Sequence, residues 1–301
     1  MSPDKTILVI GATGAQGGSV ANHLLARGTF AVRALTRNPE SDSAQKLRLL
    51  GAEVVRGTLD DRATLRAALK GVYGVFGVTS YWEHFDKEPE HGRNLINAVA
   101  GADVEHFVFS SLPPIAETTN GELSVPHFDQ KYALEQYAKA LGIAATFIRV
   151  AFYFDNFFSV FPPQRGADGA YHFGFPQGET PLAGVAAEDI GGVVAELFER
   201  PAEFIGATVG VVGDDLPPAE YASVLSRVTG KRVRYNYIPR RTFAGFGFRG
   251  AGDLADMFDF NRRFIPSRRS DLAQSRALYP SIQTFEQWAG NRRDELARLL
   301  A

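Results

Sequence analysis

The sequence contains no cysteine. This absence excludes disulfide bonds, thiol nucleophiles and zinc sites built from thiolates. An excess of one charge is missing as well, because 32 basic residues stand against 34 acidic ones and the net charge is −2. Direct binding to nucleic acid normally requires a strongly basic face or domain, so we expect none here.

Long hydrophobic runs are also missing. No uninterrupted apolar stretch is long enough to cross a bilayer as a helix. The opening residues, MSPDKTILVIGATG, lead directly into a strand-like segment and lack the basic start, long apolar centre and small-residue exit of a signal peptide. We therefore expect a soluble cytoplasmic protein that makes no contact with a membrane.

The motifs of several enzyme classes are absent. The chain has neither the G-x-S-x-G elbow of many hydrolases nor the P-loop lysine of NTPases. His84 and His91 are separated by several positions with acidic residues between them, whereas metal ligands normally converge from fixed elements. We therefore expect no metal site.

The first half of the chain alternates short apolar runs with amphipathic stretches, which predicts parallel strands covered by helices on both faces. Strands are expected at 6–10, 30–37, 53–59, 71–79, 106–112 and 145–152, with helices at 16–27, 43–52, 61–71, 92–102 and 129–142. Right-handed crossovers then give an α/β fold with a doubly wound parallel sheet, the Rossmann arrangement.

The character of the sequence changes after about residue 152. An irregular stretch rich in aromatic residues, glycine and proline follows, then helical patterns at 187–200, 217–230 and 284–300. We assign 1–152 to the Rossmann domain, with later segments able to return to its sheet. We assign 153–301 to a smaller C-terminal α/β lobe with a closing helix, placed over the strand ends where ligands of such sheets bind.

The strongest motif is the glycine loop in ILVIGATGAQGGSV, which lies between a predicted strand and a predicted helix. Gly11 permits a tight turn, Gly14 lets a pyrophosphate approach the backbone, and Gly17 lets the helix pack closely on the strand. The helix N-terminus offers N–H groups and a positive dipole end to phosphates. The pattern therefore predicts a dinucleotide site.

The end of the second strand indicates which dinucleotide binds. NAD sites usually carry a carboxylate there, whereas this strand ends in ALTRNP, with Arg37 in place of an acid. A guanidinium can pair with a 2′-phosphate, which favours NADP(H), although Glu40 opposes this by charge repulsion. Thr58 and Asp60, after the third strand, are expected to flank the adenine.

With these motifs in view, the sequence resembles the NmrA-like family, an atypical branch of the short-chain dehydrogenase/reductases, and in particular its NADP(H)-responsive redox sensors. The resemblance rests on GATGAQGGSV, LTRNP, GVTSYWE, VPHFDQKYALEQYA, RVAFYFDNFF, LAGVAAEDIGGVV and FGFRGAGDLADMFDF, and covers nearly the whole chain. It implies a Rossmann domain with a smaller lobe and a cleft between them. It also implies protein partners for some members, including transcriptional regulators.

The resemblance also implies roles for individual residues. The phosphate loop would be formed by Gly11, Thr13, Gly14, Gln16 and Gly17, and the 2′-phosphate would bind Arg37. Thr79 would lie under the nicotinamide half, Lys131 would reach its ribose, and Phe152 and Tyr153 would border its ring. The match fails at Glu40 and Ser41, where relatives carry further basic residues, which bears on the strength of the NADP(H) preference and not on its direction.

Typical enzymes of this superfamily use a Tyr-x-x-x-Lys pair, in which the lysine favours the charged form of the phenol that donates a proton. No such pair occurs in this chain, and His127 stands four residues before Lys131. In one interpretation Lys131 only fixes the ribose and His127 is structural or gating. In the other, His127 or Lys131 donates a proton, with Ser110 or Ser111 as a second donor.

Aromatic residues collect at two places in the sequence that follow strands. Tyr81 and Trp82 lie in YWEHF, and Phe154 lies in FYFDNFF beside Asp155 and Asn156. They would form either a flat apolar substrate pocket or the packing between the two lobes. Asn156, like Asp155, would orient a polar substituent or cap the following turn.

Together these features predict an NADP(H)-binding protein that acts as a nucleotide or redox sensor through a regulatory protein partner. The alternative is an NADPH-dependent reductase of an aromatic carbonyl, quinone or imine that uses His127 and Lys131. A monomer or a homodimer would suit either function.

Overall fold

The computed structural model describes residues 4–301, and the contacts between these residues divide them into two compact units. The first unit comprises the described residues up to 114, His127–Val150 and Glu188–Val209. The second comprises Ile115–Pro126, Ala151–Ala187 and Gly210–Ala301. The chain therefore passes between the units several times, and no single point in the sequence separates them.

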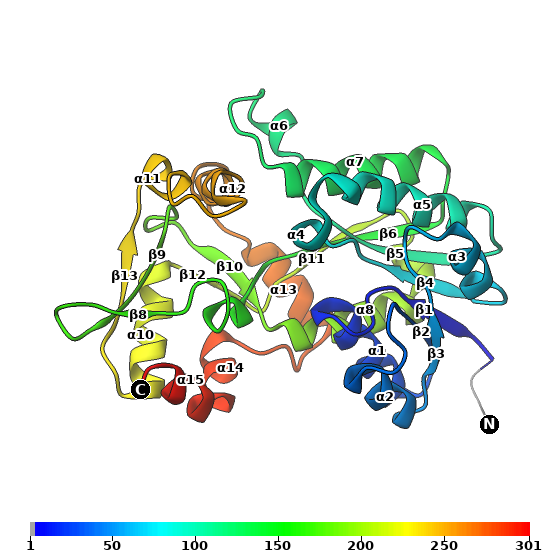
Figure 1. Cartoon of the computed structure of the whole chain (residues 1–301), viewed down its shortest axis with the longest axis horizontal. Coiled ribbons are helices and arrows are strands. Elements are labelled where there is room, and N and C mark those ends of the chain that lie inside the picture. Colours follow the sequence, from blue (N-terminus) through cyan, green and yellow to red (C-terminus); the bar gives the residue numbers. More distant parts are fainter. Residues whose placement is uncertain (1–3) are drawn as a thin grey trace. The chain divides into compact units, whose positions relative to one another are not determined.

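The first unit is built on a seven-stranded sheet in the order β11-β6-β5-β4-β1-β2-β3 (Figure 1). Its strands are β1 (Thr6–Val9), β2 (Ala31–Thr36), β3 (Glu53–Arg56), β4 (Gly74–Gly77), β5 (His106–Ser111), β6 (Ala145–Val150) and β11 (Thr208–Val211). The pairings from β3 through β1 and β4 to β6 are all parallel. The predicted doubly wound α/β fold is confirmed.

Helices cover both faces of this sheet (Figure 1). They are α1 (Ala15–Arg27), α2 (Asp42–Leu49), α3 (Arg62–Leu69), α4 (Tyr81–His84), η1 (Phe85–Lys87), α5 (Glu88–Ala100), α7 (Pro126–Ala140), η3 (Ala187–Asp189), α8 (Ile190–Glu199) and α9 (Pro201–Phe204). One continuous core joins β1, β4, β5 and β6 to the apolar sides of α3, α5 and α7, through residues such as Leu95, Phe109 and Leu134. Burial of these side chains is the main stabilising contribution.

Helix α8 returns to the first unit from late in the sequence and packs against α1. A Cβ atom on Gly191 would lie 2.2 Å from the carbonyl oxygen of Ser19, so the two helices approach at backbone distance. The Ser19 hydroxyl accepts a hydrogen bond from the Gly191 amide and donates one to the Glu188 carbonyl. These contacts fix α1 along its flank.

The second unit contains two three-stranded sheets, in the orders β12-β10-β7 and β13-β9-β8. The strands are β7 (Phe152–Tyr153), β8 (Gln164–Arg165), β9 (Tyr171–Phe175), β10 (Leu182–Val185), β12 (Asp214–Leu216) and β13 (Val233–Tyr237). The helices are α6 (Ile115–Thr118), η2 (Phe154–Phe157), α10 (Pro218–Thr229), α11 (Arg240–Ala244), α12 (Ala251–Phe264), α13 (Arg269–Leu278), α14 (Phe285–Asn291) and α15 (Arg293–Leu299).

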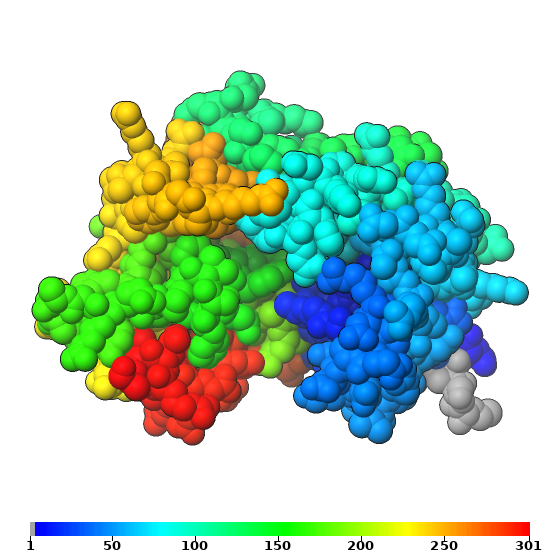
Figure 2. Space-filling model, viewed as in Figure 1, coloured from blue at the N-terminus to red at the C-terminus, as the bar shows by residue number. Residues whose placement is uncertain are grey.

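The C-terminal segment forms two helices where the sequence predicted one over 284–300. The backbone of Arg292, with φ −114° and ψ 21°, leaves the helical region and separates α14 from α15. Thr284 caps α14, in a capping box with Gln287. The two helices are red in Figure 2 and lie on the surface of the second unit, while Phe285 and Trp288 are buried.

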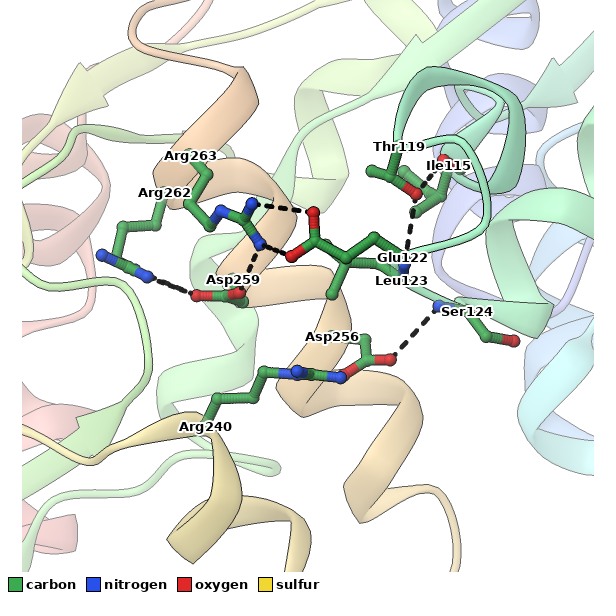
Figure 3. Close-up of polar contacts among 10 residues, drawn as sticks. All are labelled: Ile115, Thr119, Glu122, Leu123, Ser124, Arg240, Asp256, Asp259, Arg262 and Arg263. Atoms are coloured by element: carbon green, nitrogen blue, oxygen red, sulfur yellow. Dashed lines mark hydrogen bonds and ion pairs between the residues drawn. The ribbon is translucent and has the colours of Figure 1, made fainter.

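The segment 115–126 interrupts the first unit between β5 and α7 but belongs to the second unit. Both oxygens of Glu122 accept hydrogen bonds from the Arg263 guanidinium on α12 (Figure 3). Asp256, also on α12, accepts from the Ser124 amide at 3.2 Å and from Arg240 at 2.5 Å. The segment is therefore held on α12 directly before α7 begins.

Within residues 4–301, no helix combines the length and apolar character needed to span a membrane.

Candidate functional site

The glycine loop adopts the geometry that its motif predicts. Gly11 has a φ of +66°, a backbone conformation that L side chains rarely adopt, and its carbonyl accepts a hydrogen bond from the Gly14 amide at 2.9 Å. A Cβ atom on Gly17 would lie 2.3 Å from the Gly11 carbonyl oxygen. Helix α1 therefore starts closer to the strand end than any larger residue would allow.

The first turn of α1 is suited to an anion. The N-cap residue of α1 is Gly14, which has no side chain to occupy the free N–H groups, and the described first turn of α1 holds no acidic residue. Thr13 and Gly14 are exposed on the loop, and Gln16 is half-buried in the first turn. The N–H groups and the positive dipole end of α1 are thus presented at an exposed glycine turn, as in phosphate sites.

Arg37 follows β2 and forms an ion pair that the sequence did not predict. Its guanidinium lies 3.1 Å from the Glu83 carboxylate of α4, and both side chains are more than half exposed. Glu83 also lies 3.6 Å from His84. A 2′-phosphate bound by Arg37 would therefore meet a competing carboxylate on the same guanidinium.

Thr58 and Asp60, predicted to flank the adenine, both make hydrogen bonds within the first unit. The Thr58 hydroxyl accepts from the Asp61 amide at 3.3 Å, and Asp60 lies 2.7 Å from the ring nitrogen of His91 on α5. The hydrogen bond with His91 is the largest of the causes that lower the pKa of the Asp60 carboxyl below its usual value. The ring centroids of His91 and His84 are 4.7 Å apart. Because His84 also lies 3.6 Å from Glu83, a chain of contacts connects the Asp60–His91 pair to Glu83.

Thr79, after β4, and Lys131, on α7, meet in the interior with a third residue, Glu88. The Lys131 ammonium donates to the Thr79 carbonyl at 2.8 Å, to the Thr79 hydroxyl at 2.9 Å and to Oε1 of Glu88. The Thr79 hydroxyl donates to the same Glu88 oxygen at 2.6 Å. An ammonium has three N–H donors, so all of those on Lys131 are engaged inside the protein.

His127 lies one turn before Lys131 on α7, among aromatic rings. Its ring is 5.0 Å from Trp82, 5.7 Å from Tyr81 and 4.6 Å from Phe128. His127 and Tyr81 are buried, whereas Trp82 is 43% exposed. The structure thus brings together two of the predicted pocket residues, Tyr81 and Trp82, with the predicted catalytic candidate His127.

Ser110 and Ser111 are both buried at the end of β5. The Ser111 hydroxyl donates to the Glu135 carboxylate of α7 at 2.6 Å, and Glu135 is itself bonded to Lys139 at 2.6 Å. The proton of Ser111 is therefore directed to a buried carboxylate on the neighbouring helix.

The remaining predicted site residues lie in the second unit. Phe152 is half-buried among Phe161 and Phe175, and Tyr153 follows it in β7. Phe154 is fully buried, with its ring 5.0 Å from Phe285 and 5.7 Å from Trp288.

Asp155 and Asn156 follow in the 3-10 turn η2. A carboxylate oxygen of Asp155 accepts from the Ala187 amide at 3.0 Å. The Asn156 carbonyl accepts from the amides of Ser159, Val160 and Phe161. These contacts give both residues a role in the internal order of the second unit.

Two acidic residues near the candidate site, Glu83 and Glu88, were missed from the sequence. The only feature of the sequence that could have indicated a site role for Glu83 is its place between aromatic residues in YWEHF. Glu88 opens α5 beside Pro89, where an acidic residue is common because it favours the helix dipole from the solvent side. Its complete burial depends on tertiary packing.

The part of the chain from residue 4 onward contains no group of three or more His, Asp or Glu side chains placed to hold a metal ion.

A family model described as the NmrA-like family matches residues 3–289. The NmrA-like family domain-containing oxidoreductase FrzB of Cladobotryum sp. is 33% identical over 282 residues, which are 85% of this chain and 83% of that protein. A protein of Dictyostelium discoideum, named only as containing the NmrA-like domain, is 31% identical over 243 residues, 78% of this chain and 80% of its own.

Solved structures share the fold at lower identity. The crystal structure of NmrA, a negative transcriptional regulator, in complex with NADP has a TM-score of 0.84 at 22% identity and covers 99% of this chain and 98% of its own. The NADPH complex of the quinone oxidoreductase QOR2 from Escherichia coli has a TM-score of 0.73 at 22% identity, with coverage of 98% and 100%.

Proposed function

The chain belongs to the NmrA-like family, and on that premise we propose that it binds NADP(H) in its first unit and transfers hydride from it to an acceptor that needs little acid catalysis. An iminium ion or a quinone is such an acceptor. The observation that carries the proposal is the engagement of every Lys131 ammonium donor inside a unit that retains an intact dinucleotide loop.

The fit of the cofactor rests on the residues of the first unit. The turn at Gly11, the close approach at Gly17 and the first turn of α1 suit a pyrophosphate. Arg37 supplies a guanidinium after β2, where a 2′-phosphate is expected. Two related proteins, NmrA and QOR2, carry NADP and NADPH in their solved structures, which supports the same ligand here.

The proposed class of hydride acceptor follows from the state of the two candidate proton donors, Lys131 and Ser111. Reduction of an ordinary carbonyl by hydride leaves a negative oxygen that must receive a proton, whereas hydride addition to an iminium carbon produces a neutral amine directly. The Lys131 ammonium donates to Thr79 and Glu88, and the Ser111 hydroxyl donates to Glu135. Neither group is free to protonate a substrate, so an acceptor that already carries positive charge suits the site best.

A quinone is the second member of the proposed class, because a reduced quinone is a stabilised anion that can take its proton from solvent. Tyr81 and Trp82 lie beside His127, and Trp82 is partly exposed. An exposed indole offers a flat apolar surface to an aromatic acceptor. The name oxidoreductase of the relative FrzB supports turnover over passive binding.

A nucleotide sensor with a regulatory protein partner is the other candidate function. The same engagement of Lys131 and Ser111 favours it, because a site without an available proton donor turns over slowly on many substrates. In this case NADPH would change the protein and not be consumed.

One experiment separates the candidates. Calorimetric titration with NADPH, NADP⁺ and NADH is followed by absorbance measurement of NADPH oxidation with an iminium salt, a quinone and an aromatic aldehyde. NADPH binding with oxidation by the iminium or the quinone, and little by the aldehyde, is expected. Binding without oxidation by any of the three would favour the sensor, and a failure to bind NADPH would overturn the proposal as a whole.

A further inference from the structure

Glu88 and Lys131 form an ion pair that is almost entirely removed from water. Glu88 is 0% exposed and Lys131 is 8% exposed. Burial of two charges carries a large desolvation penalty, and a buried ion pair is often no more stabilising than an apolar pair of the same size. Stability alone therefore gives a weak reason for placing this pair at the end of β4, where ligands of parallel sheets bind.

The packing of two helices places the pair. A Cβ atom on Gly92 of α5 would lie 2.1 Å from the Leu134 side chain of α7, so this side chain packs directly on the α5 backbone at Gly92. Glu88 lies one turn before Gly92, and Lys131 lies just under one turn before Leu134. The glycine thus allows the carboxylate of one helix to reach the ammonium of the other.

Among the described residues, the Glu88 carboxylate makes its hydrogen bonds with Lys131 and Thr79 of the candidate site. Oε1 of Glu88 receives both the Lys131 ammonium and the Thr79 hydroxyl. Oε2 is buried and has no hydrogen-bond partner within the residues that the structure describes. An extensively bonded structural carboxylate would satisfy both oxygens, whereas this one concentrates its contacts on Lys131 and Thr79.

Burial of Lys131 makes its charge depend on this partner. Desolvation is the largest cause acting on the Lys131 ammonium and lowers its pKa, while the charge and hydrogen bond of Glu88 raise it again in part. The other titratable groups within one turn of it on α7 are His127, Asp129, Tyr132 and Glu135. Without the carboxylate, the ammonium would lose its proton at a lower pH.

We propose that Glu88 is a positioning residue of the cofactor site, whose buried carboxylate keeps Lys131 charged and in place so that the ammonium can donate to a ribose hydroxyl of bound NADP(H). Donation to the ribose replaces one of the two bonds to Thr79, and the bond to Glu88 is kept. This role rests on the proposed function, because it assumes NADP(H) as the ligand.

The test compares Glu88→Gln, Lys131→Gln and the double variant with the whole wild-type chain. NADPH dissociation constants are measured at several pH values from about pH 6 to about pH 9. Glu88→Gln is expected to weaken binding by about tenfold, and more as the pH rises, because an uncharged amide replaces an ionic partner. Lys131→Gln should weaken binding to a similar extent at every pH, and the double variant no further.

A second measurement does not depend on the cofactor. The pKa of Lys131 is followed by carbon-13 NMR of its Cε atom, assigned by its loss in Lys131→Gln. In Glu88→Gln this pKa is expected to fall by about one unit or more. An unchanged pKa would overturn the proposal even if Glu88→Gln were less stable.

Asp259→Asn serves as the matched control. Asp259 lies in the second unit, is also buried and is paired with Arg262 at 2.6 Å, so its change removes a buried carboxylate from another ion pair. It should alter thermal stability without altering NADPH affinity or the pKa of Lys131. Losses from Glu88→Gln and Lys131→Gln that multiply in the double variant would overturn the role of Glu88.

The two proposals fail in different ways. If the wild type binds NADPH and Glu88→Gln binds it equally well at every pH, only the role of Glu88 is overturned. If the wild type does not bind NADPH, the proposed function is overturned and this role falls with it.

Discussion

The Nε2 atom of His106 donates a hydrogen bond to the hydroxyl of Thr146 across β5 and β6. The two atoms are 2.7 Å apart, and the Thr146 hydroxyl must itself donate to the Phe204 carbonyl, which lies 2.7 Å away and can only accept. The proton of the neutral imidazole is thus assigned to Nε2 by the pattern of donors and acceptors. Nδ1 is buried with no hydrogen-bond partner within residues 4–301.

This arrangement predicts a loss of stability in acid. Burial lowers the pKa of His106 from 6.5 to about 4, so between these values the unfolded chain binds a proton that the folded protein does not. The contribution of His106 is complete above its unfolded pKa and is lost as the pH falls toward 4. Urea denaturation should show a fall of about 3 kcal/mol in the unfolding free energy across this interval.

A matched variant isolates this effect from other groups that titrate in acid. His106→Gln can still donate an amide proton toward Thr146 but does not titrate. Its unfolding free energy should be lower than that of the wild type at neutral pH and should change less between pH 6.5 and 4. Parallel pH profiles for the two proteins would show that His106 is not the responsible group.

Arg37→Ala should weaken NADPH binding and leave NADH binding nearly unchanged. The guanidinium is expected to pair only with the 2′-phosphate, which NADH lacks, and a charge-assisted hydrogen bond contributes about 1.5–3 kcal/mol. Calorimetric titration with both nucleotides measures the difference. Equal losses for NADPH and NADH would contradict the assignment of Arg37 to the 2′-phosphate.

Glu83→Gln should have the opposite effect on the same ligand. The Glu83 carboxylate lies 3.1 Å from the Arg37 guanidinium and competes with a 2′-phosphate for it. Because both side chains are largely exposed, solvent screens the pair, and NADPH binding should tighten by only about two- to fivefold. The gain should disappear in an Arg37→Ala background and should be absent for NADH.

Two glycine substitutions should differ sharply in their effect on stability. Gly17→Ala places a Cβ atom 2.3 Å from a backbone oxygen that cannot move aside alone, so a loss of at least about 2 kcal/mol is expected, together with loss of NADPH binding. Gly28→Ala meets nothing within 4 Å, and its φ of +68° should cost only about 1 kcal/mol. Similar losses in urea denaturation would refute the close approach at Gly17.

Asp256→Ala should loosen the segment 115–126 at Ser124. The Ser124 amide donates to Asp256 at 3.2 Å, and loss of this acceptor should speed the hydrogen exchange of that amide by about tenfold. The exchange is measured by NMR or by mass spectrometry. Glu122→Gln is the control, because the ion pair of Glu122 with Arg263 is partly exposed to solvent and should contribute little to the protection of the Ser124 amide.

The first unit was largely predictable from the sequence because its signals are local. The run TILVI before Gly11 indicates a buried strand, and the glycine spacing indicates both the turn and the close helix. In the second unit, β9 pairs with β13 from a distant part of the chain, and neither strand was predicted. The motif YHFGF conceals its alternation of buried and half-buried positions because most of its side chains are aromatic.

The candidate site was predictable only in part, for a related reason. Lys131 and Thr79 belong to recognisable motifs, but the acid that binds both of them does not. An acidic residue at the start of a helix normally points to solvent, whereas Glu88 is buried, one turn before the glycine on which the Leu134 side chain of α7 packs. A contact between distant helices leaves no periodic trace in the sequence.

Helix α1 is confined by glycine at two places, through Gly17 at its start and Gly191 along its flank. The conformational freedom of the first turn of α1 is therefore lost when the protein folds, and no further ordering of this turn is needed when a nucleotide binds. The consequence concerns rates. A phosphate group should meet an orientation that is already correct, so association at this loop should proceed in one step limited by diffusion, and differences in affinity among nucleotides should arise in how fast they leave.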